Sequence, residues 1–256
     1  MEFSHAIVRR PGAELAHGLT TAKLGPPDPA RAAGQHEDYA RALKDLGVEV
    51  VRLPALPGFP DATFVEDVAV LAGDLAVLTR PGAPSREGEV APVELALRDY
   101  FEDLVRIVAP GRLDGGDVLA IGEHHLIGLS ERTDESGAEQ LLAHLARHGL
   151  TGEVVRFAGM LHLKSGVAWL GGEDLLVAPA LAPLPALSGY RRHLVPEDES
   201  YAANSVAVNG TIVMPAGHPR TRELIHSTGR GVAEVEVAEF EKLDGGVSCL
   251  SLRFRM

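Results

Sequence analysis

An internal repeat constrains the fold of this chain more than any other feature. Four segments each contain a short apolar strand, a polar turn, a second apolar strand and then a turn rich in Pro, Gly, Arg or Ser. They begin at Val68, Val118, Val167 and Val206, at intervals of roughly 40 to 50 residues. Asn209-Gly210, between the two strands of the last segment, is a strong signal for a two-residue hairpin turn. The sequence therefore predicts four similar β-hairpin units.

The two ends of the chain supply a fifth unit. A new repeat starts at Ser248, but the chain ends before its second strand. At the N-terminus, Ala6-Ile-Val followed by Arg10-Pro-Gly-Ala13 resembles Leu75-Ala-Val-Leu78 followed by Arg80-Pro-Gly-Ala83. Pairing the first strand with the last would close a ring and hide two sheet edges. We expect a five-unit α/β ring forming one domain over residues 1–256. An ordinary α/β sandwich with similar strands is the alternative.

Segments between these hairpins have apolar residues at helical spacing. The pattern predicts helices over residues 31–46, 89–101, 133–147 and 220–227, the first ending at Gly47. The Pro-rich stretch 178–196 is interpreted as a loop or an insertion.

Composition excludes several classes of partner. The net charge is −12 and aromatic residues make up 5% of the chain, so we expect neither a basic footprint nor stacking platforms for nucleic acid. No apolar run approaches the roughly 20 residues that cross a bilayer, and the N-terminus lacks the pattern of a signal peptide. One cysteine cannot form an internal disulfide. These features favour a cytoplasmic protein without a membrane or nucleic-acid partner.

Common cofactor and metal motifs are absent from the sequence. There is no Gly-x-Gly-x-x-Gly, no phosphate-binding P-loop, no Gly-x-Ser-x-Gly, no His-Glu-x-x-His and no Cys-x-x-Cys. His124-His125 lies within a hairpin, where alternate side chains point apart, so we interpret it as a surface turn. We expect no cofactor and no metal.

Cys249 becomes a candidate nucleophile only through its place in the repeat. A lone cysteine is by itself typical of a buried small hydrophobic residue. Here it follows Gly245-Gly246, whose glycines allow close approach of a ligand. In a ring, equivalent positions of the units converge on the axis. Cysteine, histidine and carboxylate would then face one cavity, as nucleophilic catalysis requires. The polar residues at or near the corresponding point of other units are Asp67, Asp114, Asp117, His162 and Asn204.

Eight motifs in order over nearly the whole chain resemble the dimethylarginine dimethylaminohydrolases, a family of guanidine-modifying enzymes. They are Phe59-Pro-Asp-Ala-Thr-Phe-Val-Glu-Asp67, Thr79-Arg-Pro-Gly82, Leu113-Asp-Gly-Gly-Asp117, Gly128-Leu-Ser-Glu-Arg-Thr133, Leu161-His-Leu-Lys164, Glu199-Ser-Tyr-Ala-Ala-Asn204, Met214-Pro-Ala-Gly217 and Asp244-Gly-Gly-Val-Ser-Cys249. The resemblance implies a five-bladed α/β propeller. It also implies hydrolysis of N-omega-methylated arginines to citrulline and dimethylamine or methylamine, through a covalent thiouronium on cysteine.

The resemblance also implies a role for each matching residue. Cys249 would attack the guanidinium carbon, and His162 would protonate the leaving amine and then activate water. Asp114, where some relatives carry Glu, would orient His162. The remaining residues would bind the substrate: Asp61, Glu66 and Asp67 its guanidinium, Arg86 and Arg132 its carboxylate, Leu19 as part of a mobile lid, and Leu243 through its backbone.

Other functions stay open at this stage. Arginine deiminases share the cysteine, histidine and carboxylates but are longer, and agmatine deiminases do not need two arginines for a substrate carboxylate. A non-catalytic propeller that binds a partner, as a ribosome-binding factor of similar fold does, and a zinc hydrolase are the alternatives from other classes. The expected partner is a small methylated arginine. The sequence leaves the oligomeric state open, and a homodimer is compatible with it.

Overall fold

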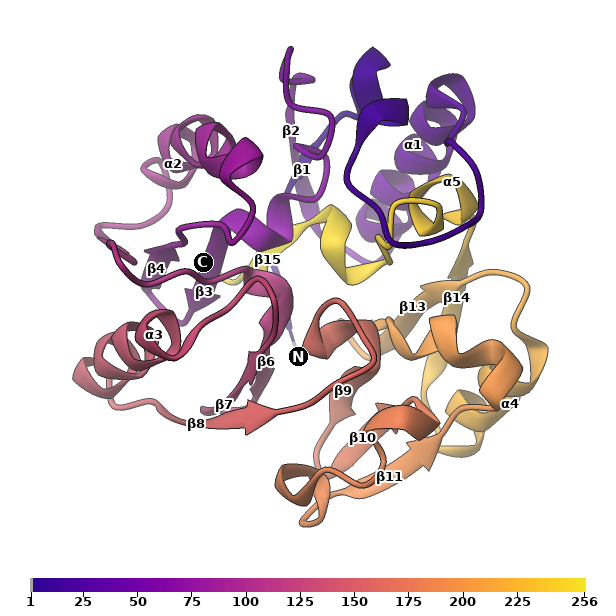
Figure 1. Ribbon diagram of the computed structural model, residues 1–256. Coiled ribbons are helices and arrows are strands. Elements are labelled where there is room, and N and C mark those ends of the chain that lie inside the picture. The colour runs from indigo at the N-terminus through magenta and orange to yellow at the C-terminus, as the bar shows by residue number, and fades with distance from the viewer. Residues whose placement is uncertain (1) are drawn as a thin grey trace.

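The computed structural model describes residues 2–256, which form a ring of five three-stranded sheets around a common centre (Figure 1). Each sheet holds an antiparallel pair of strands, formed by a hairpin in four sheets and by the two ends of the chain in the fifth. The second strand of each pair lies parallel to a third strand. The sheets are β15(Leu252–Phe254)-β1(His5–Arg9)-β2(Glu49–Leu53), β3(Ala69–Ala72)-β4(Leu75–Leu78)-β5(Asp103–Arg106), β6(Val118–Ile121)-β7(His124–Leu129)-β8(Thr151–Arg156), β9(Val167–Gly171)-β10(Asp174–Val177)-β11(Arg191–Leu194) and β12(Val206–Val208)-β13(Thr211–Pro215)-β14(Gly231–Val235).

The ring closes as the repeat predicts. Strand β1 pairs antiparallel with β15, with His5 opposite Phe254 and Ile7 opposite Leu252. The hairpins expected from Val68, Val118, Val167 and Val206 are all present. The chain therefore folds as a five-bladed α/β propeller, and the sandwich alternative is wrong.

Helices cross over on the outside of the ring between the second and third strands of four units (Figure 1). Helix α1 starts earlier than expected because Asp28 caps it, accepting the N–H groups of Ala30 and Arg31, and Pro29 fits its first turn. The helices are α1(Pro29–Asp45), α2(Val90–Leu97), α3(Glu135–Arg147), α4(Pro219–Ser227) and a short α5(Ala238–Glu241). The four expected helices are thus confirmed, with ends that differ by up to a few residues.

The third strand of each unit was not expected from the sequence. Strand β11 lies inside the Pro-rich stretch 178–196, so the interpretation of that whole stretch as a loop is wrong. These strands are short, half-exposed edge strands, as in Arg191–Leu194 and Thr151–Arg156, and lack a sustained apolar alternation. Their parallel partner in the tertiary structure decides their conformation.

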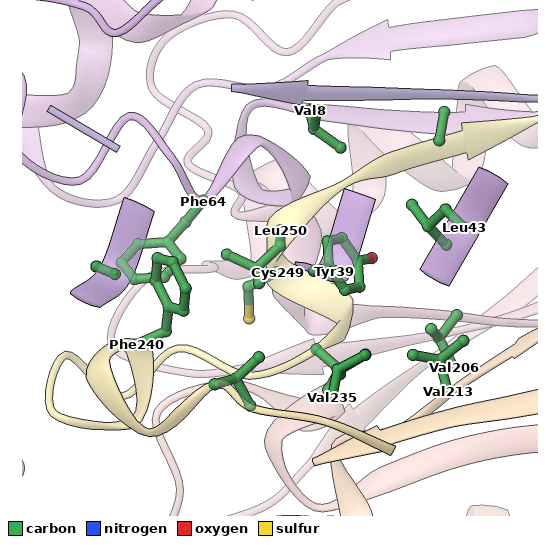
Figure 2. Packing of buried hydrophobic residues seen from close by; sticks show 14 of the residues in the cluster. Val8, Tyr39, Leu43, Phe64, Val206, Val213, Val235, Phe240, Cys249 and Leu250 are labelled. Carbon is green, nitrogen blue, oxygen red and sulfur yellow. The ribbon is translucent and has the colours of Figure 1, made fainter. Parts of the chain in front are cut away.

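Apolar side chains fill the space between neighbouring units. One cluster joins α1, the inner strand β12 and the chain before β15, and includes Tyr39, Phe240 and Cys249 (Figure 2). The inner strands β3, β6, β9, β12 and β15 line a central cavity of ≈ 150 Å³, and β9 contacts both β6 and β12 while β15 contacts β3. Within residues 2–256, no helix has the length and apolar character needed to span a membrane.

Candidate active site

Four short 3₁₀ helices meet at one end of the ring, each just before an inner strand. They are η2(Val65–Val68), η4(Gly115–Asp117), η5(Leu163–Ser165) and η9(Ser248–Leu250), and η2 contacts η9 and η4 while η4 contacts η5. Asp114 and His162 are the residues that precede η4 and η5, and Cys249 lies within η9. The convergence of equivalent positions expected from the repeat is therefore confirmed.

His162 forms a buried pair with Asp114. The imidazole Nε2 lies 3.1 Å from Asp114 Oδ2, and Nδ1 lies 3.9 Å from Asp67 Oδ1. Gly116 permits this packing, because a Cβ at that position would approach His162 Nδ1 to 2.6 Å. Asp114 is itself held by the backbone N–H of Gly82, which donates to Oδ1 at 2.8 Å. The pair is thus fixed in position before any substrate binds.

The carboxylates around His162 favour its charged form. Burial alone would lower the pKa of His162, but Asp67, Asp114 and Asp117 outweigh burial and raise this pKa to about 9. Burial would raise the pKa of Asp114, whereas the hydrogen bond and charge of His162 lower it below its usual value. At neutral pH the site therefore holds an imidazolium that can donate a proton.

Cys249 is the only cysteine of the chain and is 7% exposed. In Figure 2 its thiol extends from the η9 turn between the Phe64–Phe240 pair and Tyr39. Burial, followed by the charges of Glu66 and Asp67, raises the pKa of Cys249 to about 12. The thiol is therefore neutral in the empty site, and an additional positive charge beside the sulfur would favour the thiolate.

An acidic wall with one buried arginine lies beside the thiol. Arg86 Nη1 donates to Asp67 Oδ2 at 2.6 Å, and its Nε and Nη2 donate to Glu89. Nη2 also donates to the carbonyl of Phe64 at 3.0 Å. These contacts occupy four of the five N–H groups of the guanidinium, so one on Nη1 is left for a ligand. Burial raises the pKa of Asp61, although Arg86 opposes that shift.

Arg132 lies at the other side of the pocket and is more accessible than Arg86. Its Nη1 lies 3.9 Å from Asp114 Oδ2, and its backbone N–H donates to Ser130 Oγ at 2.9 Å. Its guanidinium has fewer protein partners than that of Arg86. It can therefore bind the carboxylate of a ligand in addition to its contact with Asp114.

A segment from Gly18 to Leu24 covers the site. The N–H of Leu19 donates to Asp61 Oδ1 at 3.0 Å. Thr20 Oγ1 and Thr21 Oγ1 donate to Asp244 Oδ2 at 3.2 and 3.1 Å. The slot beneath has a volume of only ≈ 20 Å³, about enough for one water molecule. This covering segment must therefore move before an amino acid can enter.

Eight of the ten expected site residues line this slot. They are Leu19, Asp61, Asp67, Arg86, Arg132, His162, Leu243 and Cys249. Asp114 lies behind His162 and does not line the slot, as expected for an orienting residue.

Glu66 is the expected residue that the structure places elsewhere. Its carboxylate lines the central cavity, where it accepts Ser248 Oγ at 2.7 Å and pairs with Lys164 at 2.7 Å and Arg253 at 3.1 Å. The neighbouring side chains of Glu66 and Asp67 thus point to opposite sides of the 3₁₀ turns, Glu66 to the central cavity and Asp67 to the slot. His125 also lines the central cavity from strand β7 and is buried, so its interpretation as part of a surface turn is wrong.

Asp67, Asp114 and His162 are also close enough to share a cation, since one ligand atom of each lies within 4.8 Å of the others. Their oxygens already accept from Gly116, Arg86, Gly82 and His162. The closeness of Asp67 and Asp114 to His162 is accounted for by the charge of the imidazolium, which both carboxylates stabilise.

Sequence reasoning missed the roles of several residues that support the site. Asp117 accepts Ser130 Oγ, Thr133 Oγ1 and the N–H of Leu163. Its equivalence to Asp67 in the repeat was visible, but its three partners were not. Glu89 carries no signal in the sequence, because its partner Arg86 becomes apparent only when the η3(Pro84–Glu89) turn is folded.

Comparison with known proteins agrees with this geometry. The arginine deiminase family profile matches residues 92–165. The chain is 46% identical to the N(G),N(G)-dimethylarginine dimethylaminohydrolase of Pseudomonas aeruginosa over 98% of this chain and 100% of that protein. It is 37% identical to the enzyme of the same name from Streptomyces coelicolor over 100% of this chain and 98% of the relative. The crystal structure of the Pseudomonas aeruginosa enzyme, a C249S mutant in complex with citrulline, superposes with a TM-score of 0.97 at 45% identity and covers 99% of this chain and 100% of its own.

A five-bladed α/β propeller with a thiol, an imidazole and carboxylates at one end of its axis belongs to the guanidine-modifying hydrolases. Within that class, the identity over full length shows that this chain belongs to the dimethylarginine dimethylaminohydrolase family.

Proposed function

We propose that this protein hydrolyses asymmetric dimethylarginine and monomethylarginine to citrulline, releasing dimethylamine or methylamine. The observation that carries the proposal is that Cys249 and His162 meet in one acidic slot, with Asp114 paired to His162 from behind. The citrulline complex of the Pseudomonas aeruginosa enzyme supports the same product.

The acidic wall accounts for selection of a cationic substrate. Asp61 and Asp67 present carboxylate oxygens to the slot, where a planar guanidinium can be held by charge-assisted hydrogen bonds. Asp67 is fixed by Gly116 N at 3.0 Å and by Arg86, so it is oriented before the ligand arrives. Asp61 accepts the N–H of Leu19, which belongs to the covering segment. A guanidinium that binds Asp61 therefore also affects the position of that segment.

Substrate binding generates the nucleophile. The pKa of Cys249 is raised to about 12 by burial and by the charges of Glu66 and Asp67. Formation of the thiolate at neutral pH therefore needs an additional positive charge beside the sulfur. A guanidinium beside the sulfur supplies that charge, and its attraction strengthens where water is excluded. Cys249 then loses its proton to solvent, and the thiolate faces the guanidinium carbon.

The reaction proceeds in two halves. The sulfur of Cys249 forms a bond to the guanidinium carbon, the C–N bond to the methylated nitrogen breaks, and His162 gives its proton to the departing amine. This leaves an S-alkylthiouronium on Cys249. Neutral His162 then takes a proton from water, whose oxygen attacks the same carbon. The C–S bond breaks, and citrulline and the thiolate are released.

The α-carboxylate of the substrate is bound at the mouth of the slot. Arg132 offers an accessible guanidinium there, and Arg86 offers the single N–H left on Nη1. Leu19 and Leu243 line the slot and enclose the aliphatic chain. The family resemblance implies that Leu243 contacts the substrate through its backbone. Glu66 acts from the other side, by fixing Ser248 and hence the turn that carries the nucleophile.

The proposal extends to the organisation of the protein. Residues 1–256 act as one catalytic domain, without a metal or cofactor, in the cytoplasm. A homodimer is compatible with the sequence, and sedimentation of the purified chain tests for it directly.

The deciding experiment measures citrulline and dimethylamine from asymmetric dimethylarginine, with Cys249→Ser as the inactive variant. We expect stoichiometric release by the wild type and no detectable turnover by the variant, with an unchanged circular dichroism spectrum. Arginine and agmatine are run in parallel, because faster turnover of either would assign the chain to a deiminase instead. Full activity of Cys249→Ser would show that the thiol is not the nucleophile.

A further inference from the structure

The side chains that precede three of the five inner strands share one structural task. Asp67, Asp117 and Asn204 each stand within two residues of an inner strand, at β3, β6 and β12. Each accepts a backbone N–H from the 3₁₀ turn of another unit: Asp67 from Gly116 at 3.0 Å, Asp117 from Leu163 at 3.0 Å and Asn204 from Ser248 at 2.9 Å.

The turns held in this way are those that carry the reacting groups. Gly116 follows Asp114 by two residues, Leu163 follows His162, and Ser248 precedes Cys249. One contact between units therefore fixes the acid, another the imidazole and the third the thiol. Of the three holding side chains, only Asn204 is neutral.

Asn204 is buried and lies against the thiol as well as the turn. Its Nδ2 lies 3.9 Å from Cys249 Sγ, within the range of a weak N–H to sulfur contact. Gly246 packs directly on the amide, since a Cβ there would lie 2.3 Å from Asn204 Cγ. The same packing brings the N–H of Gly246 to 3.4 Å from the sulfur. Two N–H donors thus approach Sγ from one side.

Charge explains why an amide suits this position better than a carboxylate. A carboxylate could still accept the N–H of Ser248, as Asp67 and Asp117 do for their partners. It would also place a third negative charge near Cys249, where Glu66 and Asp67 already disfavour ionisation of the thiol. An amide keeps the acceptor and adds a donor for the developing thiolate.

We propose that Asn204 is a positioning residue for the nucleophile: its carbonyl fixes the turn that carries Cys249, and its N–H group stabilises the thiolate. This inference rests on the proposed role of Cys249.

The test uses the matched variants Asn204→Asp and Asn209→Asp. The chain has only these two asparagines. The Asn209 amide donates to the carbonyls of Phe3 and Leu46 and does not line the slot that holds Cys249. Alkylation by iodoacetamide followed by mass spectrometry reports Cys249 alone, because it is the sole cysteine, and requires no turnover. For Asn204→Asp we expect the alkylation rate at about pH 9 to fall at least about tenfold, because each unit of rise in the pKa of the thiol lowers the thiolate fraction tenfold. We also expect kcat to fall at least about tenfold with little change in KM. Asn209→Asp should keep the wild-type alkylation rate.

A wild-type alkylation rate and kcat in folded Asn204→Asp would overturn the proposal. If that variant fails to fold, Asn204→Ser removes the amide without adding a charge. A lower kcat and slower alkylation in the serine variant support the inference, and wild-type values of both overturn it. Failure of the proposed function is seen separately, as turnover by Cys249→Ser.

Discussion

His162 Nε2 lies 3.1 Å from Asp114 Oδ2, and the carboxylate is completely buried. A buried pair of this kind is most favourable while the imidazole is charged, because an uncompensated negative charge is costly to bury. The pair therefore links the chemistry of the site to the stability of the fold.

Stability should depend on pH through His162. Its folded pKa of about 9 exceeds its ordinary 6.5, so the contribution is fully present below about pH 6.5 and is lost as pH rises through about 9. The shift corresponds to roughly 3 kcal/mol. Urea unfolding of wild type and His162→Gln between about pH 6 and pH 10 should show an advantage of the wild type that shrinks with pH. The exposed His226→Gln provides the control, and a constant advantage for wild type over His162→Gln would contradict the assignment.

Asp117 should be the most sensitive of the supporting residues. Asp117→Ala leaves the hydroxyls of Ser130 and Thr133 and the N–H of Leu163 without their acceptor. An unsatisfied buried group costs about 1–3 kcal/mol, so we expect a loss of about 3 kcal/mol or more in the free energy of unfolding. Asp117→Asn keeps an acceptor and should lose less. Equal losses in chemical denaturation would show that the three hydrogen bonds do not carry the stabilisation.

Asp244 should control opening of the covering segment. Asp244 has φ = 59°, a conformation that glycine adopts readily. Asp244→Gly therefore keeps the backbone and removes the carboxylate that binds Thr20 and Thr21. We expect tryptic cleavage after Lys23, in the same segment, to accelerate several-fold. Asp244→Asn retains an acceptor oxygen and should be cleaved at close to the wild-type rate. Slow cleavage of the glycine variant would mean that other contacts hold the segment closed.

Glu89 should tune substrate binding through Arg86. Burial raises the pKa of Glu89 to about 6 despite the ion pair with Arg86. Protonation below about pH 6 weakens this pair and frees Arg86 to move, so KM of the wild type should rise there. Glu89→Gln mimics the protonated state and should show a higher KM, by about tenfold, at every pH. Glu87→Gln, on the exposed side of the same turn, should keep the wild-type KM; a pH-independent wild-type KM would refute the coupling.

The repeat could be found in the sequence because hairpin strands alternate with turn residues that have local requirements. Asn209-Gly210 fits a tight turn in any context, and the apolar strands around it need only a core to face. The place of Cys249 in its unit, together with His162 and Asp114, then followed from closing five units into a ring. The edge strands could not be found in this way, because β8 and β11 owe their conformation to a parallel partner that lies beyond an intervening connection of the same unit.

The local sequence by itself determined the hairpins, most of the helices and which residues gather at the axis. Tertiary structure alone decided which way each side chain faces and how it is charged. Glu66 and Asp67 are neighbours, yet one turns to the central cavity and the other to the slot. The raised pKa values of His162 and Cys249 likewise depend on burial and on carboxylates from other units. Electrostatic energies depend on distances and on exclusion of water, and both are set only when the five units pack together.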